Sequence, residues 1–300
     1  MRHSGRRYGT LAAGAALALW LGYAGPVAAA SIDPALAITG SVEFDTASVI
    51  FLPGTTHSST MSAVSGGATT NSTVNGSTVA GSNPLNGTLT MINDGFGVTT
   101  AATSVFATIT GNRQYELPFD INVTVDNNSL TDTFEVVFRS AIRQAVAASG
   151  ADSFAEAEFN LGKAADQNDL FFSEIISDTF FGDEVDGVDQ GTAGAPQSAD
   201  KQQSLTFNVS PGQSLSLRVA FDVTGGALVD PGSTSVDATT LLSLERVTNL
   251  TQPTPVPLPA VPPTRIVPAI MLPPVAVPTF PATAISPRRM RTPVPAPAFP

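Results

Sequence analysis

The chain has 300 residues, no cysteine, and 25 acidic residues against 14 basic ones. Without cysteine, neither a disulfide framework nor a thiolate metal site can form, so a hydrophobic core must stabilise the fold. All the acidic residues lie between residues 31 and 252, where only seven basic residues occur, so this segment has a net charge of −18. Because such a segment repels phosphates, we expect no nucleic-acid partner.

The first thirty residues have the pattern of a cleavable secretory signal peptide. Three arginines come first, an apolar run rich in Ala and Leu extends from residue 10 to 23, and residues 28–30 are alanines. Small side chains at these last positions suit signal peptidase, so we predict cleavage before Ser31. A transmembrane anchor is the alternative, but the apolar run is shorter than the roughly 20 residues that span a bilayer. We therefore expect a secreted, extracellular or cell-envelope protein.

From residue 31 to 252, apolar and polar side chains alternate with a period of two, as in half-buried β-strands. The clearest runs are Phe119–Val125, Ala155–Leu161, Leu205–Val209, Leu215–Val223 and Leu242–Leu244. Many strands separated by turn residues predict an all-β domain over residues 31–252. The expected fold is an antiparallel β-sandwich of the jelly-roll-like or immunoglobulin-like kind.

Two parts of this domain require a choice between local structures. Leu205–Val209 and Leu215–Val223 flank the turn sequence Ser-Pro-Gly-Gln, and we interpret them as the two strands of a β-hairpin. Residues 134–150 fit either a strand or a helical apolar stripe. We favour one long strand there, because the segments on both sides are predicted strands.

Two segments differ in composition from the rest. Residues 54–88 are rich in Ser, Thr, Gly and Asn, and predict either a mobile loop or a set of short polar strands. Residues 253–300 hold 16 of the 24 prolines. Proline lacks an amide donor and fixes its backbone angle, so neither a helix nor a central strand persists there. We predict a disordered proline-rich tail.

An acidic, glycine-containing segment from residue 182 to 191 supplies the candidate metal ligands. These are Asp183, Glu184, Asp186 and Asp189. Hard cations such as calcium prefer several oxygen ligands on a flexible loop, which this segment offers. Its spacing differs from the D-x-D-x-D-G loop with a closing glutamate, and a solvated acidic loop is the alternative. Calcium is the one cofactor that the sequence suggests.

Catalytic constellations are weak by comparison. Glu156 and Glu158 point to the same side of a predicted strand, and paired carboxylates can catalyse glycoside hydrolysis. The alternative is that they form the solvent face of that strand. His57 is the only histidine after the predicted cleavage site, and it lies in the Ser/Thr-rich stretch, where we expect a solvated loop residue. With no G-x-S-x-G motif anywhere, we predict that the protein is not an enzyme.

A short motif at the start of the proline-rich tail carries a family resemblance. Val256-Pro257-Leu258-Pro259-Ala260 is similar to the Val-Pro-Leu-Pro-Ala form that opens the sorting signal of PEP-CTERM proteins, a class exported by Gram-negative bacteria. The resemblance implies export, C-terminal processing by a membrane protease and association with an exopolysaccharide or biofilm matrix. The family signal continues into an apolar helix, whereas prolines continue here, so we expect no stable transmembrane anchor in this form. A reading-frame change in a GC-rich gene would also produce such a tail.

The function expected from these features is that of a non-enzymatic, exported structural or adhesive protein of the cell envelope or extracellular matrix. The alternative is a calcium-assisted polysaccharide-binding module or hydrolase. The expected partners are extracellular polysaccharide or other matrix proteins.

Overall fold

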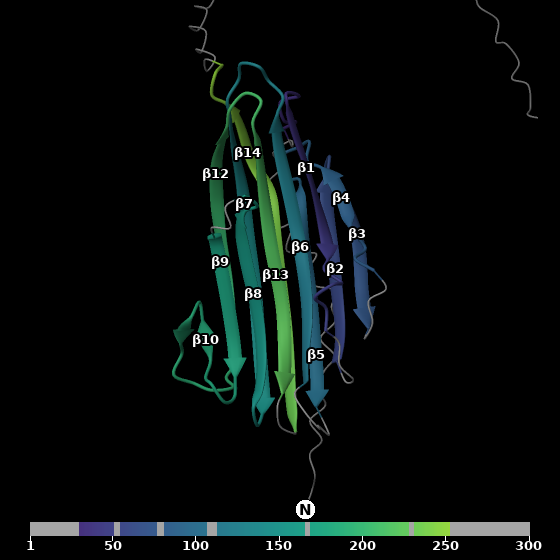
Figure 1. The fold of residues 1–300 in the computed structure, drawn as a ribbon, viewed down its shortest axis with the longest axis vertical. Coiled ribbons are helices and arrows are strands. Elements are labelled where there is room, and N and C mark those ends of the chain that lie inside the picture. Colours follow the sequence, from purple (N-terminus) through teal and green to yellow (C-terminus); the bar gives the residue numbers. More distant parts are fainter. Residues whose placement is uncertain are drawn as a thin grey trace, which may run out of the picture. The chain divides into compact units, whose positions relative to one another are not determined.

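The computed structural model describes residues 30–50, 55–76, 81–106, 113–165, 169–227 and 231–252. These residues form two antiparallel β-sheets packed face to face (Figure 1), which confirms the predicted all-β sandwich. The predicted signal peptide and proline-rich tail lie outside the described residues. Within the described part of the chain, no helix has the length and apolarity needed to cross a membrane.

The eight-stranded sheet has the strand order β11-β10-β9-β8-β13-β6-β1-β4. Its strands, in chain order, are β1 (Leu36–Phe44), β4 (Leu85–Thr88), β6 (Arg113–Asn127), β8 (Ser153–Lys163), β9 (Asp169–Asp178), β10 (Glu184–Val185), β11 (Val188–Asp189) and β13 (Ser214–Ala227).

The six-stranded sheet has the strand order β12-β7-β14-β5-β2-β3. Its strands, in chain order, are β2 (Thr55–Ser65), β3 (Ala68–Gly76), β5 (Gly95–Phe106), β7 (Phe134–Gly150), β12 (Gln197–Val209) and β14 (Gly232–Asn249).

Period-two alternation explains the core between the sheets. Most odd-numbered residues of β6, β8 and β13 face inward and are buried, while most of their even-numbered neighbours lie on the outer face. Within this core the ring of Phe119 packs edge-to-face against Phe44, with centroids 4.9 Å apart, and lies tilted against Phe221 at 6.0 Å. Burial of such side chains supplies the main stabilisation that a cysteine-free body needs.

The observed strands decide between the alternatives that the sequence left open in two segments. The prediction of one long strand over residues 134–150 is confirmed, since β7 covers the whole range. The stretch 54–88 contains β2, β3 and β4, and β2 alone has 11 residues, so the loop alternative is wrong for its described part. The inward positions of β2 hold the apolar Met61 and Ala63 and three polar side chains that make hydrogen bonds, which lets this polar sequence pack against the core.

The predicted hairpin around residues 210–213 is wrong. The turn forms, because the amide of Gln213 donates to the carbonyl of Ser210 at 3.0 Å. However, β12 pairs with β7 in one sheet, while β13 pairs with β6 and β8 in the other. The turn is therefore a crossover between the sheets. Alternation shows that a segment is half buried but does not specify its hydrogen-bonding neighbour.

Candidate functional site

Carboxylates gather on the outer face of the eight-stranded sheet. Glu158 of β8 lies directly opposite Glu174 of β9 on one side and Asp222 of β13 on the other. Glu156 is on the same face, two residues earlier in β8. Oxygen atoms of Glu156, Glu158 and Glu174 all lie within 4.8 Å of one another. We call these three residues, together with Asp222, the acidic cluster.

Burial and the repulsion of neighbouring carboxylates shift the pKa of Glu156. Burial, followed by the charges of Glu174, Glu158, Asp222 and Glu116, raises the pKa of Glu156 to about 7. Such a shift means that the charged form of Glu156 is disfavoured, so this carboxyl holds a proton at a pH where ordinary carboxyls are ionised.

Asp222 behaves in the same way. Its pKa is raised to about 7 by burial and then by the charges of Glu158, Glu116 and Asp120, while Arg218 lowers it. The guanidinium of Arg218 is already engaged, since it lies 2.8 Å from a carboxylate oxygen of Asp120. Both partners, with Asp222, border a hollow of about 180 Å³ on this face. The hollow therefore combines one ion pair with a carboxyl that is easily protonated.

Glu174 joins the cluster from β9. Burial raises its pKa, and the charges of Glu158, Glu184 and Asp186 add to the shift. Three converging carboxylates offer the oxygen ligands that calcium prefers, and a divalent ion would relieve the repulsion between them. Alternation in the sequence placed Glu156 and Glu158 on one face, but Glu174 and Asp222 carried no local signal and were missed.

The predicted calcium ligands lie near the end of β9, and their carboxylates bind protein donors. Asp183 is fully buried and accepts hydrogen bonds from the amides of Asp178, Gly194 and Ala195 and from the hydroxyl of Thr192, at 2.7–3.0 Å. Although burial favours its neutral form, these hydrogen bonds lower its pKa. The carboxylate of Asp183 therefore has its hydrogen-bonding needs met by protein donors, and these hydrogen bonds hold its loop together.

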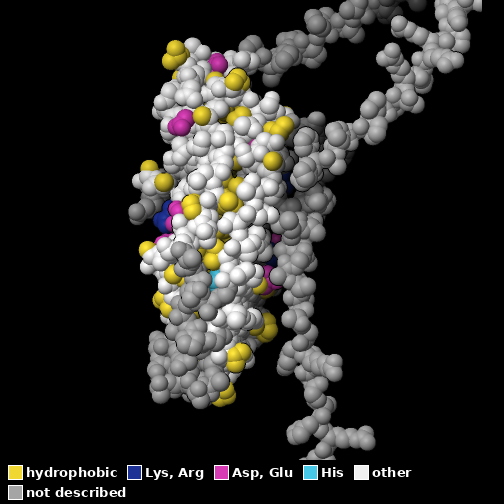
Figure 2. All heavy atoms as spheres, turned by 90° about the vertical axis from the view of Figure 1, so that its right-hand side faces the viewer, with side chains coloured by type: hydrophobic (Ala, Val, Ile, Leu, Met, Phe, Trp, Pro, Cys, Tyr) yellow, Lys and Arg dark blue, Asp and Glu magenta, His cyan; other side chains and the backbone are white. Residues whose placement is uncertain are grey.

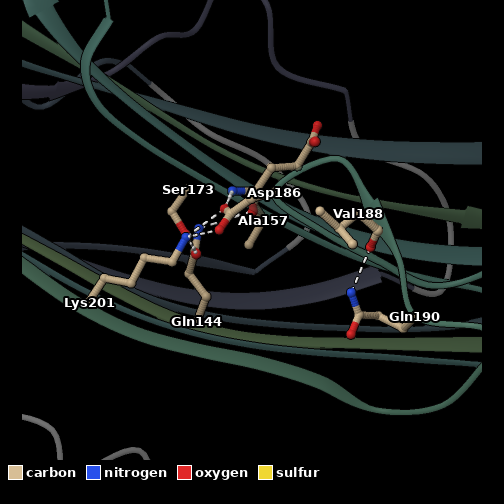
Figure 3. A network of polar contacts seen from close by, with 8 residues as sticks. Gln144, Ala157, Ser173, Asp186, Val188, Gln190 and Lys201 are labelled. Atoms are coloured by element: carbon tan, nitrogen blue, oxygen red, sulfur yellow. Dashed lines mark hydrogen bonds and ion pairs between the residues drawn. The ribbon is translucent and has the colours of Figure 1, made fainter.

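The other three predicted calcium ligands each make different contacts. Asp186 forms an ion pair with Lys201 of β12 and accepts the amide of Glu174 at 3.1 Å (Figure 3). Asp189 accepts the amide of Gly191 at 2.7 Å, and Glu184 pairs with β9 in the sheet. Among the described residues, the structure therefore brings together Glu156, Glu158 and Glu174 rather than the four predicted ligands.

A second polar contact in Figure 3 joins the two sheets through the core. Gln144 of β7 is buried and donates to the carbonyl of Ala157 at 3.0 Å, while its oxygen accepts the hydroxyl of Ser173 at 2.8 Å. Because buried polar groups are costly unless they are paired, this bridge fixes how β7 lies against β8 and β9. The bridge lies on the inner face of β8 and β9, and the acidic cluster lies on the outer face of the same sheet.

His57 does not lie in a solvated loop, so that expectation is wrong. It belongs to β2 and faces the core with 5% of its surface exposed. Its Nδ1 lies 3.1 Å from the hydroxyl of Ser59, which is 2.7 Å from the hydroxyl of Thr100. Burial lowers the pKa of the imidazole. These contacts give His57 a structural place inside the sandwich.

Comparison with known proteins adds little to this picture. No family model and no curated protein matches the chain. Two solved structures, described as infectious bursal disease virus of the Gx and Gt strains, align with 71% of this chain at 12% identity. The alignments cover 60% and 61% of those chains, with TM-scores of 0.13 and 0.14. Likeness at this level carries no argument about this chain.

Proposed function

We propose that the protein is a non-enzymatic, exported structural or adhesive component of the cell envelope or extracellular matrix of a Gram-negative bacterium. The observation that carries the proposal is the form of the body. It is a sandwich of long strands, of which β14 has 18 residues and extends about 60 Å. The chemistry of its candidate site lies on an open sheet face.

The sequence supports the same proposal independently. The signal-peptide pattern of residues 1–30 accounts for export, and the PEP-CTERM-like motif at residues 256–260 links the chain to matrix-associated proteins. A body of charge −18 stays soluble at high concentration outside the cell.

Fractionation of the producing bacterium tests this function. We expect mass spectrometry to find a mature N-terminus at Ser31 in the envelope or matrix fraction, and a deletion strain to form a weaker matrix. A chain retained in the cytoplasm with residues 1–30 intact would contradict the proposal.

A second candidate function is a calcium-assisted polysaccharide-binding module. The convergence of Glu156, Glu158 and Glu174 favours it, because like charges directly opposite each other destabilise a sheet unless a cation compensates them. Binding of calcium to the native state alone would raise the melting temperature with ion concentration.

Two charge-matched variants locate any such effect. Glu158→Gln should abolish a calcium-dependent rise in melting temperature, whereas Asp189→Asn in the other acidic segment should leave it intact. If Asp189→Asn abolished the rise instead, the ion would occupy the loop of residues 182–191. If the wild-type protein showed no rise, the structural function would stand without calcium.

A further inference from the structure

The two sheets end in four edge strands, β11 and β4 in one sheet and β12 and β3 in the other. An edge strand presents unpaired amide and carbonyl groups to any other strand that approaches it. Proteins that remain monomeric protect such edges by making them very short or by placing charges, prolines or bulges on them.

Three of the four edges carry such protection. β11 has two residues and β4 has four, too few for a stable ladder with another chain. β12 is long, but it carries Asp200 and Lys201 in its first half. The ammonium of Lys201 is paired with Asp186 from the turn between β10 and β11, so this edge is also held next to a neighbouring hairpin.

The fourth edge, β3, has none of these features. Its nine residues read Ala-Thr-Thr-Asn-Ser-Thr-Val-Asn-Gly, with no charged residue and no proline. Most of its described side chains are exposed, and Val74 is the buried exception. Figure 1 shows β3 at the outer side of the sandwich. Figure 2 looks onto that side, where most of the described surface is uncharged and polar.

The distribution of charge favours β3 as the place where a second copy of the chain approaches. A body with a net charge of −18 repels a second copy of itself over most of its surface. The acidic cluster lies on the other sheet, and β3 with its partner strand β2 contains no Asp, Glu, Lys or Arg, while His57 of β2 is buried in the core. This edge is therefore where two copies meet with the least repulsion.

We propose that β3 is a self-association edge, through which two copies of the chain join their six-stranded sheets into one continuous antiparallel sheet. The pairing is isologous, with the same strand contributed by both copies. This inference does not depend on the proposed matrix function, although a scaffold protein would use such a contact.

The pairing has a natural register. A two-fold axis perpendicular to the sheet places residues of the same face opposite each other, and an axis at Ser72 engages the whole strand. Asn71 of one copy then faces Thr73 of the other on the outer side. The neighbouring strands already pair in this manner, since the hydroxyls of Thr60 and Thr73 lie 3.3 Å apart. A single ladder of this length buries little apolar area, so the dimer is weak and forms reversibly.

Sedimentation velocity of the full chain over a concentration series tests the proposal. We expect the wild-type protein to shift from monomer to dimer as concentration rises. The double variant Asn71→Lys with Thr73→Lys should remain monomeric, because the added charges face each other across the edge. The matched control, Ser198→Lys with Gln202→Lys on β12, adds the same charge to the other long edge and should dimerise at least as readily as the wild type.

Hydrogen exchange on the wild-type protein gives a readout that needs no variant. Amides of β3 should become more protected at the concentrations where the dimer forms. The proposal is overturned if the wild type remains monomeric throughout, if both double variants lose the dimer equally, or if dimerisation leaves β3 exchange unchanged.

Discussion

Glu158 on β8 lies directly opposite Asp222 on β13, so two carboxyl groups occupy adjacent positions on one sheet face. Burial raises the pKa of Asp222 from 3.8 to about 7, and the charge of Glu158 is the next largest cause. Glu156, two residues along β8, has a pKa raised from 4.5 to about 7, first by burial. The native state thus binds protons that the unfolded chain releases.

The pH dependence of stability follows from this difference. A carboxyl whose pKa is raised by folding stabilises the native state at low pH, and this contribution is lost as pH rises from about 4 to about 7. We expect the melting temperature, followed by circular dichroism, to increase when the pH is lowered from about 8 to about 5. Asp183, whose pKa is lowered, opposes this trend only below its ordinary value of 3.8. A melting temperature that falls steadily over that range would refute the expected repulsion.

Removing one charge from the acidic cluster should stabilise the protein. Asp222→Asn keeps the shape of the side chain and eliminates its repulsion with Glu158 and Glu116. We expect a higher melting temperature at pH 8, with about 2–4 °C for each kcal/mol gained in a body of this size. At pH 5 the gain should be smaller, because the wild-type carboxyl is then protonated.

Asp237→Asn is the matched control for that variant. Asp237 lies on the outer face of the six-stranded sheet, opposite Ala101 and Ala145 rather than other carboxylates. Its substitution should change the melting temperature little at either pH. Equal gains in both variants would mean that overall net charge, and not the acidic cluster, limits stability.

The sequence predicted the strands of this fold better than their arrangement. Inward and outward positions of β8 follow directly from alternation, which is why Glu156 and Glu158 were placed on one face. Glu174 and Asp222 reach them only through the pairing of β8 with β9 and β13, which is set by packing across the whole sheet. The hairpin prediction at residues 210–213 was wrong for the same reason. Strong alternation on both sides of a turn does not exclude a crossover between sheets.

The structural roles of two buried aspartates could not be predicted from the sequence either. Asp94 and Asp183 each lie near turn residues and resemble ordinary solvated turn aspartates in the sequence. In the structure both are buried and each carboxylate accepts four hydrogen bonds. The donors are mostly backbone amides, which leave no signature in residue type. Only the three-dimensional course of the loops identifies these residues as structural centres.

Asp94 should therefore be among the most sensitive polar positions. Its carboxylate accepts the amides of Gly66 and Gly67 from the β2–β3 turn and those of Thr90 and Met91 that precede β5, at 2.8–3.0 Å. Asp94→Ala leaves these amides without their acceptor, and we expect a loss of at least about 2 kcal/mol in the free energy of unfolding. Urea denaturation measures it.

An exposed aspartate provides the comparison for Asp94. Asp45 accepts the amide of Ala47 at 2.9 Å and the hydroxyl of Ser48 at 3.1 Å, both in contact with solvent. Because water replaces the lost acceptor there, Asp45→Ala should cost less than about 1 kcal/mol. Similar losses at the two positions would show that the buried network at Asp94 does not hold the β2–β3 turn in place.

Tyr115 packs across β6 and β13 against a residue without a side chain. It is fully buried and lies directly opposite Gly225, where an added Cβ would be 2.6 Å from the phenol oxygen. Burial raises the pKa of Tyr115 to about 12, although a 3.5 Å hydrogen bond from Thr234 lowers it. The phenol therefore stays neutral in the native state up to about pH 12, and stability falls as pH rises from 10 towards that value.

This residue can be observed directly, since Tyr115 is the only tyrosine after residue 30 and the single tryptophan precedes it. Phenolate absorbance of the processed chain should appear near pH 10 in urea but only towards pH 12 in the native state. Gly225→Ala should displace the ring, destabilise the protein by about 1–3 kcal/mol and lower the native titration midpoint. Gly81→Ala, where an added Cβ meets no atom within 4 Å, should alter neither quantity. If the native phenol titrated near pH 10, solvent would reach the ring. The close contact with Gly225 would then not exclude solvent from Tyr115.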